Sequence, residues 1–316
     1  MTALRLGTRR SVLARTQSTH VAERLRRLGH RVELVEITTE GDLSDAPLTQ
    51  IGGTGVFVSA LRAALHSGRV DLAVHSLKDL PTAPDPALVV AAVPPREDSR
   101  DALVARDGLT LGQLRPGAVV GTGSPRRTAQ LAALGLGLDV RPIRGNVDTR
   151  VGYVASGLLD AVVLARAGLA RLGRLDVVTE VLDPIQVLPA PGQGALAVEC
   201  RGDRPEVRAA LAALDDPDTR VCVEAERSLL ATLEAGCTAP VGALAEIVDG
   251  EDGLELFLRA FAGTADGEVA LRRSLVGPLA DPRALGAQLA QILLDDGAAG
   301  LEASSPTATQ PSEPVS

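Results

Sequence analysis

The segments Ser67-Gly-Arg-Val-Asp-Leu-Ala-Val74 and Ser156-Gly-Leu-Leu-Asp-Ala-Val-Val163 are related in sequence although they lie far apart in the chain. Each carries a turn glycine, an aspartate and a short apolar run, which is typical of the passage from a helix into a strand. Upstream of each lies a second matched pair, Gly7-Thr8 and Gly121-Thr122, at the end of a predicted strand. Because the matches fall at the same element boundaries, the sequence predicts two related α/β halves with a ligand site between them.

The residues around these landmarks alternate between strand and helix patterns. Strands are predicted over Leu4–Thr8 and Arg31–Ile37, with a helix between them whose apolar residues recur at helical spacing. In the later half, a strand ends at Gly123, and Ser124 and Pro125 suit the N-cap and the first position of a helix. Alternation of this kind favours largely parallel sheets covered by helices.

The first half is longer than the second between the matched landmarks. The surplus residues, Thr39–Pro47 and Ile51–Gly55, are rich in turn formers. An insertion of this composition predicts a mobile loop or lid at about residues 39–57.

The last third of the chain has a different pattern. Apolar spacing predicts a helix from Asp216 to Ala235 with Gly236 as its C-terminal cap, and Cys237 on the loop just beyond. Residues 242–276 alternate as an antiparallel sheet, and residues 283–296 form a last helix. The tail over residues 303–316, rich in Ser, Thr and Pro, is expected to be disordered.

Composition and charge exclude several classes of protein. The 316 residues include no Trp, one Tyr and three Phe, so the interior must be built from Leu, Val, Ile and Ala. A net charge of −8 gives no support for a general binder of nucleic acid or anionic membranes. No segment approaches the length of a membrane span, and the polar residues after Arg9-Arg10 leave no apolar run for an export signal.

The three cysteines lack the paired spacings of a zinc site or a disulfide framework, so we expect no metal and a reducing cytoplasm. Cys200 on a predicted strand and Cys222 inside a predicted helix are interpreted as small buried hydrophobes. Cys237 lies on a loop where a reactant could reach the thiol, although an inert loop cysteine is the commoner case.

Lys78 is the only lysine among 32 basic residues, and it lies in His75-Ser-Leu-Lys-Asp79 at the carboxyl end of a predicted parallel strand. A single retained lysine favours a need for a compact ammonium group over chance survival at the surface, and ligands bind at such strand ends. Asp79 is either part of an ordinary surface ion pair or a carboxylate that stabilises a developing cation or moves a proton. The residues alone leave both possibilities open.

Arginines cluster at the ends of predicted elements, and arginine suits a bidentate grip on carboxylate or phosphate. Arg126 and Arg127 lie in the first turn of a helix, where positive charge opposes the helix dipole and costs stability unless an anion is bound. The pattern favours a polyanionic ligand over a set of solvated side chains. The clustered residues are Arg9, Arg10, Arg126, Arg127, Arg144 and Arg150.

Seven ordered segments between Leu4 and about Ala299 resemble the porphobilinogen deaminase family, and together they are far more specific than any one of them. They are Gly7–Ser11, Val74–Asp79, Gly121–Arg127, Arg144–Arg150, Ala167–Gly173, Leu188–Ala195 and Leu233–Cys237.

The resemblance implies an α/β protein of three domains. Two would be similar to type II periplasmic binding proteins, with domain 1 over residues 1–94 and 195–212 and domain 2 over residues 100–188. Domain 3, over residues 217–302, would be a small α+β domain with an antiparallel sheet that carries Cys237 on a loop. We expect a cytoplasmic monomer with no nucleic-acid or membrane partner.

The same resemblance implies a transferase of tetrapyrrole (haem) biosynthesis. Its dipyrromethane cofactor would be joined to Cys237 by a thioether, and four porphobilinogen molecules would be deaminated and joined head to tail before water releases hydroxymethylbilane. Asp79 would be the catalytic carboxylate that stabilises an azafulvenium cation. The residues that would bind cofactor and substrate are Arg9, Ser11, Ser76, Lys78, Thr122, Ser124, Arg126, Arg127, Arg144, Arg150, Arg171 and Gln193.

Four positions depart from the family pattern. Thr54 and Ser59 stand where the loop often carries lysines, Gly123 replaces a serine, and Val12 replaces a proline. These departures leave the catalytic carboxylate and the cofactor cysteine in place. Two other interpretations stay open, which are a non-enzymatic two-lobed anion-binding protein and an enzyme that uses its lysine as a Schiff-base nucleophile.

Overall fold

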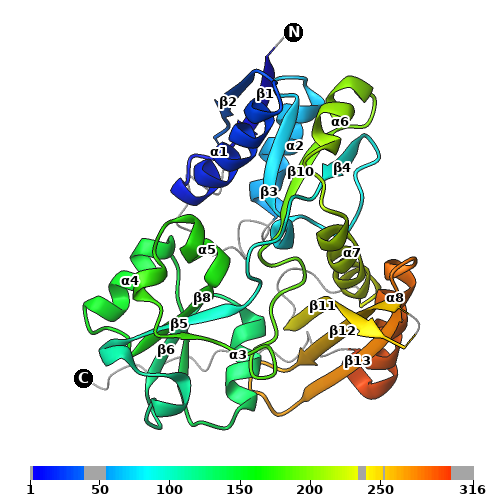
Figure 1. Cartoon of the computed structure of the whole chain (residues 1–316). Coiled ribbons are helices and arrows are strands. Elements are labelled where there is room, and N and C mark those ends of the chain that lie inside the picture. Colours follow the sequence, from blue (N-terminus) through cyan, green and yellow to red (C-terminus); the bar gives the residue numbers. More distant parts are fainter. Residues whose placement is uncertain (1–2, 39–54, 234–239, 252, 300–316) are drawn as a thin grey trace, which may run out of the picture.

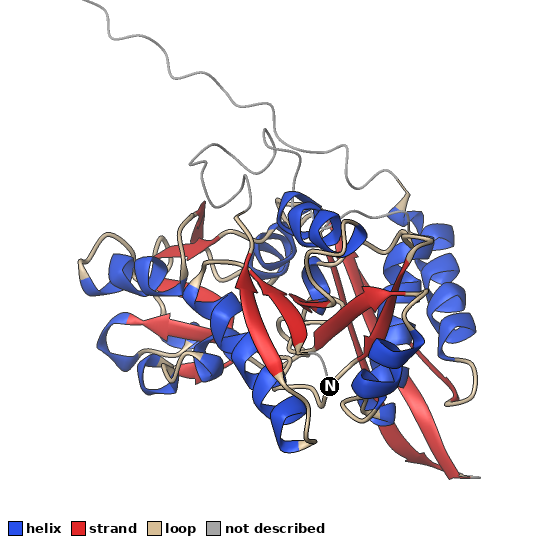
Figure 2. Cartoon of the chain, turned by 90° about the horizontal axis from the view of Figure 1, so that it is seen from above, coloured by secondary structure: helices blue, strands red, loops and turns tan. Residues whose placement is uncertain are grey.

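The computed structural model describes residues 3–38, 55–233, 240–251 and 253–299. These residues form two five-stranded sheets and one three-stranded sheet. Figure 1 shows the first sheet at the top, the second at lower left and the third at lower right. Figure 2, a view from above, shows helices lying around the strands. The predicted class, two α/β domains and a small domain with an antiparallel sheet, is confirmed.

The first sheet, in domain 1, has the strand order β2-β1-β3-β10-β4. Its strands are β1 (Leu4–Thr8), β2 (Val32–Glu36), β3 (Leu72–Ser76), β4 (Leu88–Ala92) and β10 (Leu196–Arg201). The other elements of this domain are α1 (Val12–Arg27), α2 (Gly55–His66), the 3₁₀ turn η2 (Leu77–Asp79) and α6 (Pro205–Ala212). β2, β1 and β3 are parallel, whereas β10 is antiparallel to both of its neighbours.

The second sheet, in domain 2, repeats this arrangement with the order β7-β6-β8-β5-β9. Its strands are β5 (Asp101–Ala105), β6 (Val119–Thr122), β7 (Asp139–Pro142), β8 (Ala161–Ala165) and β9 (Glu180–Val181). The helices are α3 (Pro125–Ala133), α4 (Val147–Ala155) and α5 (Arg166–Arg171), with short turns η3 (Arg106–Gly108), η4 (Leu111–Gln113) and η5 (Leu175–Val177). β5 is antiparallel to β8 and β9, as β10 is to its neighbours in domain 1.

Equivalent aspartates confirm the internal repeat predicted from the sequence. The Asp71 carboxylate accepts a hydrogen bond from the backbone N–H of Arg5 at 2.9 Å. In domain 2 the Asp160 carboxylate accepts one from the backbone N–H of Val119 at 2.8 Å. Each aspartate therefore fixes the start of the third parallel strand against the first.

Each sheet is largely parallel, as predicted, with one strand that runs against its neighbours. The antiparallel strand of each sheet is the one that arrives from the other domain, so it enters from the opposite end of the sheet. β3 begins at Leu72, two residues after the predicted start, and α2 begins at Gly55, inside the loop predicted over residues 39–57. Residues 39–54 of that loop lie outside the described residues.

Domain 3 is built from a three-stranded antiparallel sheet and two long helices. The elements are α7 (Pro217–Thr232), β11 (Val241–Gly250), β12 (Gly253–Gly263), β13 (Ala270–Pro278), α8 (Pro282–Leu293) and the π turn η6 (Leu294–Ala298). Asp216 caps α7 by accepting from the backbone N–H of Thr219 at 2.8 Å. α7 ends at Thr232 rather than at the predicted Ala235, and Gly236 and Cys237 lie outside the described residues, as does the tail over 303–316.

The interior is aliphatic, as the composition predicted. Among the largest fully buried side chains of the described residues, Phe261 is the one aromatic and the others are leucines. Phe261 packs with Ala129, Leu188 and Leu244, so it joins domain 2 to domain 3.

One buried carboxylate joins all three domains. Glu226 on α7 is fully buried, and its two oxygens accept from Arg96 Nη1 at 2.6 Å and Nη2 at 3.0 Å. They also accept from the backbone N–H groups of Gly192 at 2.6 Å and Ala245 at 3.0 Å. Arg96 and Gly192 lie on the two segments that connect domains 1 and 2, so domain 3 is bonded to both connections.

Candidate active site

The η2 turn carries Lys78 and Asp79 at the carboxyl end of β3, at the edge of the sheet where parallel strands place ligands. Leu77 is buried beneath the turn and donates its backbone N–H to the Ala195 carbonyl at 3.0 Å. The turn is therefore anchored to the connection that returns from domain 2 to domain 1.

Lys78 reaches toward that connection. Its Nζ donates to Gln193 Oε1 at 3.3 Å. Burial lowers the pKa of the Lys78 ammonium to about 8, against the opposing effect of Asp79 and with a further contribution from Arg127 of domain 2. The lysine is thus close enough to the basic residues of domain 2 for their charges to act on it.

The connection approaches β3 closely because glycines flank Gln193. Gly192 has φ +74° and lies against the Leu77 side chain, and Gly194 has φ +88° and lies against the Glu97 carbonyl. A side chain at Gly194 would place a Cβ 2.3 Å from that carbonyl oxygen. Two left-handed glycines therefore let the backbone pass between the domains and aim Gln193 into the junction.

A fully buried aspartate, Asp101, lies at the centre of the domain 2 side of the site. Its oxygens accept from Arg126 Nη2 at 2.8 Å, Arg127 Nη2 at 2.7 Å and Gln193 Nε2 at 2.8 Å. Burial alone would raise the pKa of Asp101, but the two guanidinium groups outweigh it and hold the pKa well below its usual range. Gln193 therefore links Lys78 of domain 1 to the Asp101 cluster of domain 2.

Arg126 and Arg127 are buried, not solvated, at the start of α3. Besides Asp101, Arg126 donates to the Leu188 carbonyl, and Arg127 Nη1 donates to the Val163 carbonyl at 3.0 Å. Asp101 therefore supplies part of the negative charge that the sequence predicted near the start of α3. Within the described residues, the buried Nε atoms of both arginines have no hydrogen-bond partner.

Residues at the end of β1 occupy the corresponding place in domain 1. Ser11 is the N-cap of α1 and accepts from the backbone N–H of Ala14 at 3.3 Å. Arg9 is half-buried just before it. Ser76, at the end of β3, accepts a hydrogen bond on Oγ from Gln17 Nε2 of α1 at 3.0 Å, so α1 is bonded to the end of β3.

The turn between β6 and α3 confirms Ser124 as the N-cap residue and Pro125 as the first residue of the helix. Thr122 is buried, and its Oγ1 accepts from the Ser124 backbone N–H at 3.3 Å. A Cβ at Gly123 would lie 2.8 Å from the Ile143 carbonyl oxygen. A glycine at this position therefore permits a close approach of the segment that follows β7.

The remaining arginines lie on the segments that follow β7 and β8, including α4 and α5. Arg150 is half-buried and donates from Nε to the Gly145 carbonyl at 2.9 Å, whereas Arg144 is exposed. Arg171 ends α5 and donates from Nη2 to the Gly194 carbonyl at 2.6 Å. Burial lowers the pKa of both Arg150 and Arg171.

Sequence reasoning missed Glu226, described above, and two buried carboxylates near the site. Asp101 is the first residue of the apolar strand β5, and Glu199 lies within the apolar strand β10. A single charged residue in an apolar strand is the sequence pattern that could have identified both. Glu199 accepts from Arg62 Nη2 at 2.8 Å, and its Oε2 lies 3.3 Å from His75 Nε2. Through His75, these contacts join β3 to the neighbouring strand β10. β3 is the strand that leads into the η2 turn.

The thiols of Cys200 and Cys222 are buried, as predicted. Burial raises the pKa of the Cys200 thiol to about 11 and that of Cys222 to about 12, so both are weak nucleophiles. Cys237, the predicted cofactor residue, lies outside the described residues.

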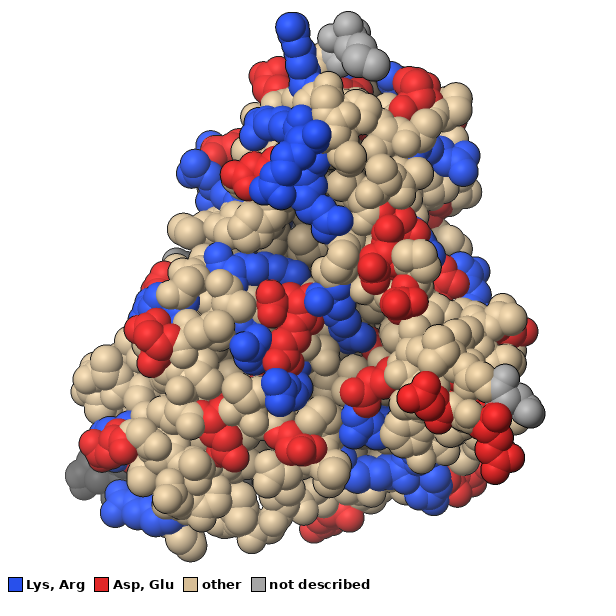
Figure 3. Space-filling view, viewed as in Figure 1, with Lys and Arg blue, Asp and Glu red and all other residues tan. Residues whose placement is uncertain are grey.

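Figure 3 shows a hollow between the upper and lower parts of one face, with Lys and Arg side chains along its rim. Within the described residues, no helix is long and apolar enough to cross a membrane, and no group of three or more metal-ligating side chains is found in that same part of the chain.

The fold and site define a two-lobed α/β protein whose facing sheet edges carry clustered cationic side chains. The family model for porphobilinogen deaminase, dipyromethane cofactor binding domain, matches residues 4–209, and the porphobilinogen deaminase C-terminal domain model matches residues 220–295. The chain belongs to the porphobilinogen deaminase family.

Curated relatives agree over nearly the whole chain. The porphobilinogen deaminase of Mycobacteroides abscessus is 59% identical over 303 residues, which cover 94% of this chain and 99% of that protein. The porphobilinogen deaminase of Mycobacterium tuberculosis is 59% identical over 300 residues, covering 93% of this chain and 97% of that protein.

Solved structures of substrate-binding proteins are similar over about two thirds of the chain. A periplasmic substrate-binding protein of an ABC transporter from Coxiella burnetii aligns with a TM-score of 0.43 at 15% identity, covering 69% of this chain and 94% of that chain. A nutrient-binding protein from Burkholderia cenocepacia, bound to methionine, aligns with a TM-score of 0.42 at 14% identity, covering 69% and 93%.

Proposed function

We propose that this protein is an active porphobilinogen deaminase, a hydroxymethylbilane synthase. It would join four porphobilinogen molecules head to tail with loss of ammonia and release the product by hydrolysis. The observation that carries the proposal is the Gln193 bridge, which links Lys78 of domain 1 to the Asp101–Arg126–Arg127 cluster of domain 2. This bridge brings the cationic ends of both sheets to one junction, as a substrate and product rich in carboxylates require.

We propose further that a dipyrromethane is joined by a thioether to Cys237. When bound, this group supplies the primer to which pyrroles are added. The residues fit such a group because its acetate and propionate side chains need cations, and because the buried Nε atoms of Arg126 and Arg127 lack partners within the described residues. The raised pKa values of the Cys200 and Cys222 thiols favour the third cysteine of the sequence.

Asp79 is proposed as the catalytic carboxylate. Its negative charge would stabilise the cation that forms on porphobilinogen as ammonia leaves, and its oxygens would accept hydrogen bonds from the pyrrole N–H groups. Asp101 would hold Arg126 and Arg127 in fixed orientations, which lowers the cost of binding a carboxylate. The residues proposed to bind cofactor and substrate are Arg9, Ser11, Ser76, Lys78, Thr122, Ser124, Arg126, Arg127, Arg144, Arg150, Arg171 and Gln193.

The mass of the purified protein tests the proposal. We expect intact protein to exceed the mass calculated from its sequence by two pyrrole units, to consume porphobilinogen, and to lose the added mass in Cys237→Ser. An unmodified protein that turns over porphobilinogen would contradict the cofactor, and a modified protein without turnover would favour a non-enzymatic binder.

The lowered pKa of Lys78 also suits a Schiff-base nucleophile. That chemistry needs an aldehyde or ketone, which porphobilinogen does not carry. Borohydride reduction during turnover separates the two, since covalent substrate on Lys78 would replace the mechanism proposed above.

We propose a cytoplasmic monomer. The two unpaired buried cysteines support a reducing compartment. Light scattering on the purified protein tests the oligomeric state, and a stable dimer would contradict it.

A further inference from the structure

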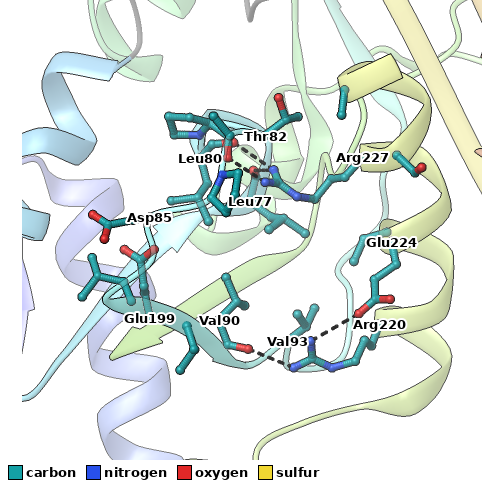
Figure 4. Close-up of a pocket in the computed structure, with 18 of the residues that line it drawn as sticks. Leu77, Leu80, Thr82, Asp85, Val90, Val93, Glu199, Arg220, Glu224 and Arg227 are labelled. Atoms are coloured by element: carbon teal, nitrogen blue, oxygen red, sulfur yellow. Dashed lines mark hydrogen bonds and ion pairs between the residues drawn. The ribbon is translucent and has the colours of Figure 1, made fainter. Parts of the chain in front are cut away.

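Arg227 extends from α7 of domain 3 to the backbone of the η2 turn in domain 1 (Figure 4). Its Nη1 donates to the Leu80 carbonyl at 2.8 Å and to the Leu77 carbonyl at 3.4 Å, and its Nη2 donates to the Pro81 carbonyl at 2.7 Å. The side chain lines a cavity of about 490 Å³ between α7, β4 and this turn. One guanidinium group thus contacts the backbone on both sides of Lys78 and Asp79.

The Leu80 and Pro81 carbonyls need donors because η2 is too short to satisfy them internally. The turn has one such bond at its end, from the Leu80 N–H to the Leu77 carbonyl at 3.1 Å. Pro81 follows directly and has no N–H with which to continue the turn. A guanidinium group offers five donors in a rigid fork, so a single arginine can serve several carbonyls at fixed positions.

An apolar contact on the same face of α7 supports this clamp. Val223 lies one turn before Arg227 on the helix, is 1% exposed, and belongs to one buried cluster with Leu77 and Leu80. α7 therefore holds the turn with one apolar side chain and one arginine, four residues apart.

The other side of the turn is bonded to the connection from domain 2. The Leu77 N–H donates to Ala195, and Lys78 Nζ donates to Gln193. Asp79 lies on the backbone between the Leu77 and Leu80 carbonyls that Arg227 contacts. A change at Arg227 would consequently shift Asp79, while the Gln193 side stays bonded.

We propose that Arg227 is a positioning residue, which sets the place of the Asp79 carboxylate from domain 3. The proposal rests on the function proposed above, in which Asp79 stabilises the cation formed from porphobilinogen. Arg227 acts through the η2 backbone and needs no contact with substrate or cofactor.

The test compares Arg227→Gln and Arg227→Lys with Arg283→Gln. Arg283 lines the same cavity but is an exposed side chain paired with Glu224, so it controls for loss of charge there. We expect Arg227→Gln to fold and to keep its cofactor mass while kcat, measured per folded and cofactor-bearing protein, falls ~10- to 100-fold, the effect of a misplaced catalytic group. KM is expected to change by less than about threefold, since the carboxylate-binding arginines are untouched. Arg227→Lys should recover part of kcat, and Arg283→Gln should match wild type.

The proposal is overturned if Arg227→Gln keeps kcat within about twofold of wild type, or if kcat falls only in proportion to lost cofactor or folded protein. If Arg227→Gln does not fold, Arg227→Lys decides: a wild-type kcat overturns the proposal, and a reduced kcat at normal cofactor content supports it. If neither variant folds, Arg227 acts in stability and the proposal is overturned. An error in the proposed function can be distinguished from an error in the role of Arg227, because the wild-type protein would then show no turnover of porphobilinogen.

Discussion

Replacement of Glu226 by glutamine is expected to weaken the junction of the three domains. Each carboxylate oxygen accepts one bond from Arg96 and one from a backbone N–H, Ala245 on Oε1 and Gly192 on Oε2. Glutamine presents one oxygen and one NH₂ group, so either orientation turns a donor toward two other donors. The change also leaves the Arg96 guanidinium without its carboxylate.

The free-energy cost follows from burial. Removing one partner of a buried ion pair costs ~3–5 kcal/mol, and Arg96 is 13% exposed, so water can reach part of it. We therefore expect a loss near the lower limit, ~3 kcal/mol, which for a chain of 316 residues corresponds to a fall in Tm of ~5 °C. Far-UV circular dichroism is the suitable probe, because the chain has no Trp and one Tyr.

Glu224→Gln is the matched control. Glu224 lies on the same helix and is 27% exposed, and its partners are Arg220 and Arg283. Its loss is expected to cost under ~1 kcal/mol. In a double-mutant cycle, Arg96→Met combined with Glu226→Gln should show a coupling energy above ~0.5 kcal/mol. A Tm of Glu226→Gln equal to that of the control, or additive effects in the cycle, would refute the reasoning.

Three further outcomes are expected. Asp79→Asn should fold with normal cofactor mass and lose ~10²–10³-fold in kcat, because the amide cannot balance a developing cation; turnover like that of wild type removes Asp79 from its role. Cys237→Ser should give no colour with Ehrlich's reagent, and a positive reaction would mean that another residue holds the dipyrromethane. The folded-state pKa of Lys78, about 8, is lower than its ordinary value of 10.5, so the ammonium is lost as pH rises through 8 and the KM for porphobilinogen should rise above that pH. Between pH 8 and 10.5 the unfolded state binds more protons at Lys78 than the folded state does. The free energy of unfolding should therefore increase as pH rises through this range, because the charged form of the buried lysine is lost. Lys78→Arg should abolish the rise in KM, and an unchanged rise would assign the titration to another group.

Local sequence patterns were enough to predict the alternation of strands and helices, the internal repeat and the position of the candidate turn. Apolar periodicity, caps and turn glycines act over a few residues, so Leu4–Thr8 and the start of α3 at Pro125 were predicted correctly. The repeated Ser-Gly segments predicted two related halves, and the end of β3 was correctly expected to lead into Lys78 and Asp79. The absence of Trp and the scarcity of other aromatics likewise predicted an aliphatic interior.

The partners of the buried charged side chains could be seen in the fold but not in the sequence. Gln193 and Asp101 are 92 residues apart, Arg96 and Glu226 are 130, and Arg227 and Leu80 are 147. Such pairs depend on how sheets and domains dock, and side-chain periodicity within one element carries no information about that docking. The antiparallel direction of β5 and β10 was not predicted for the same reason, since it is set by the path of the chain between domains.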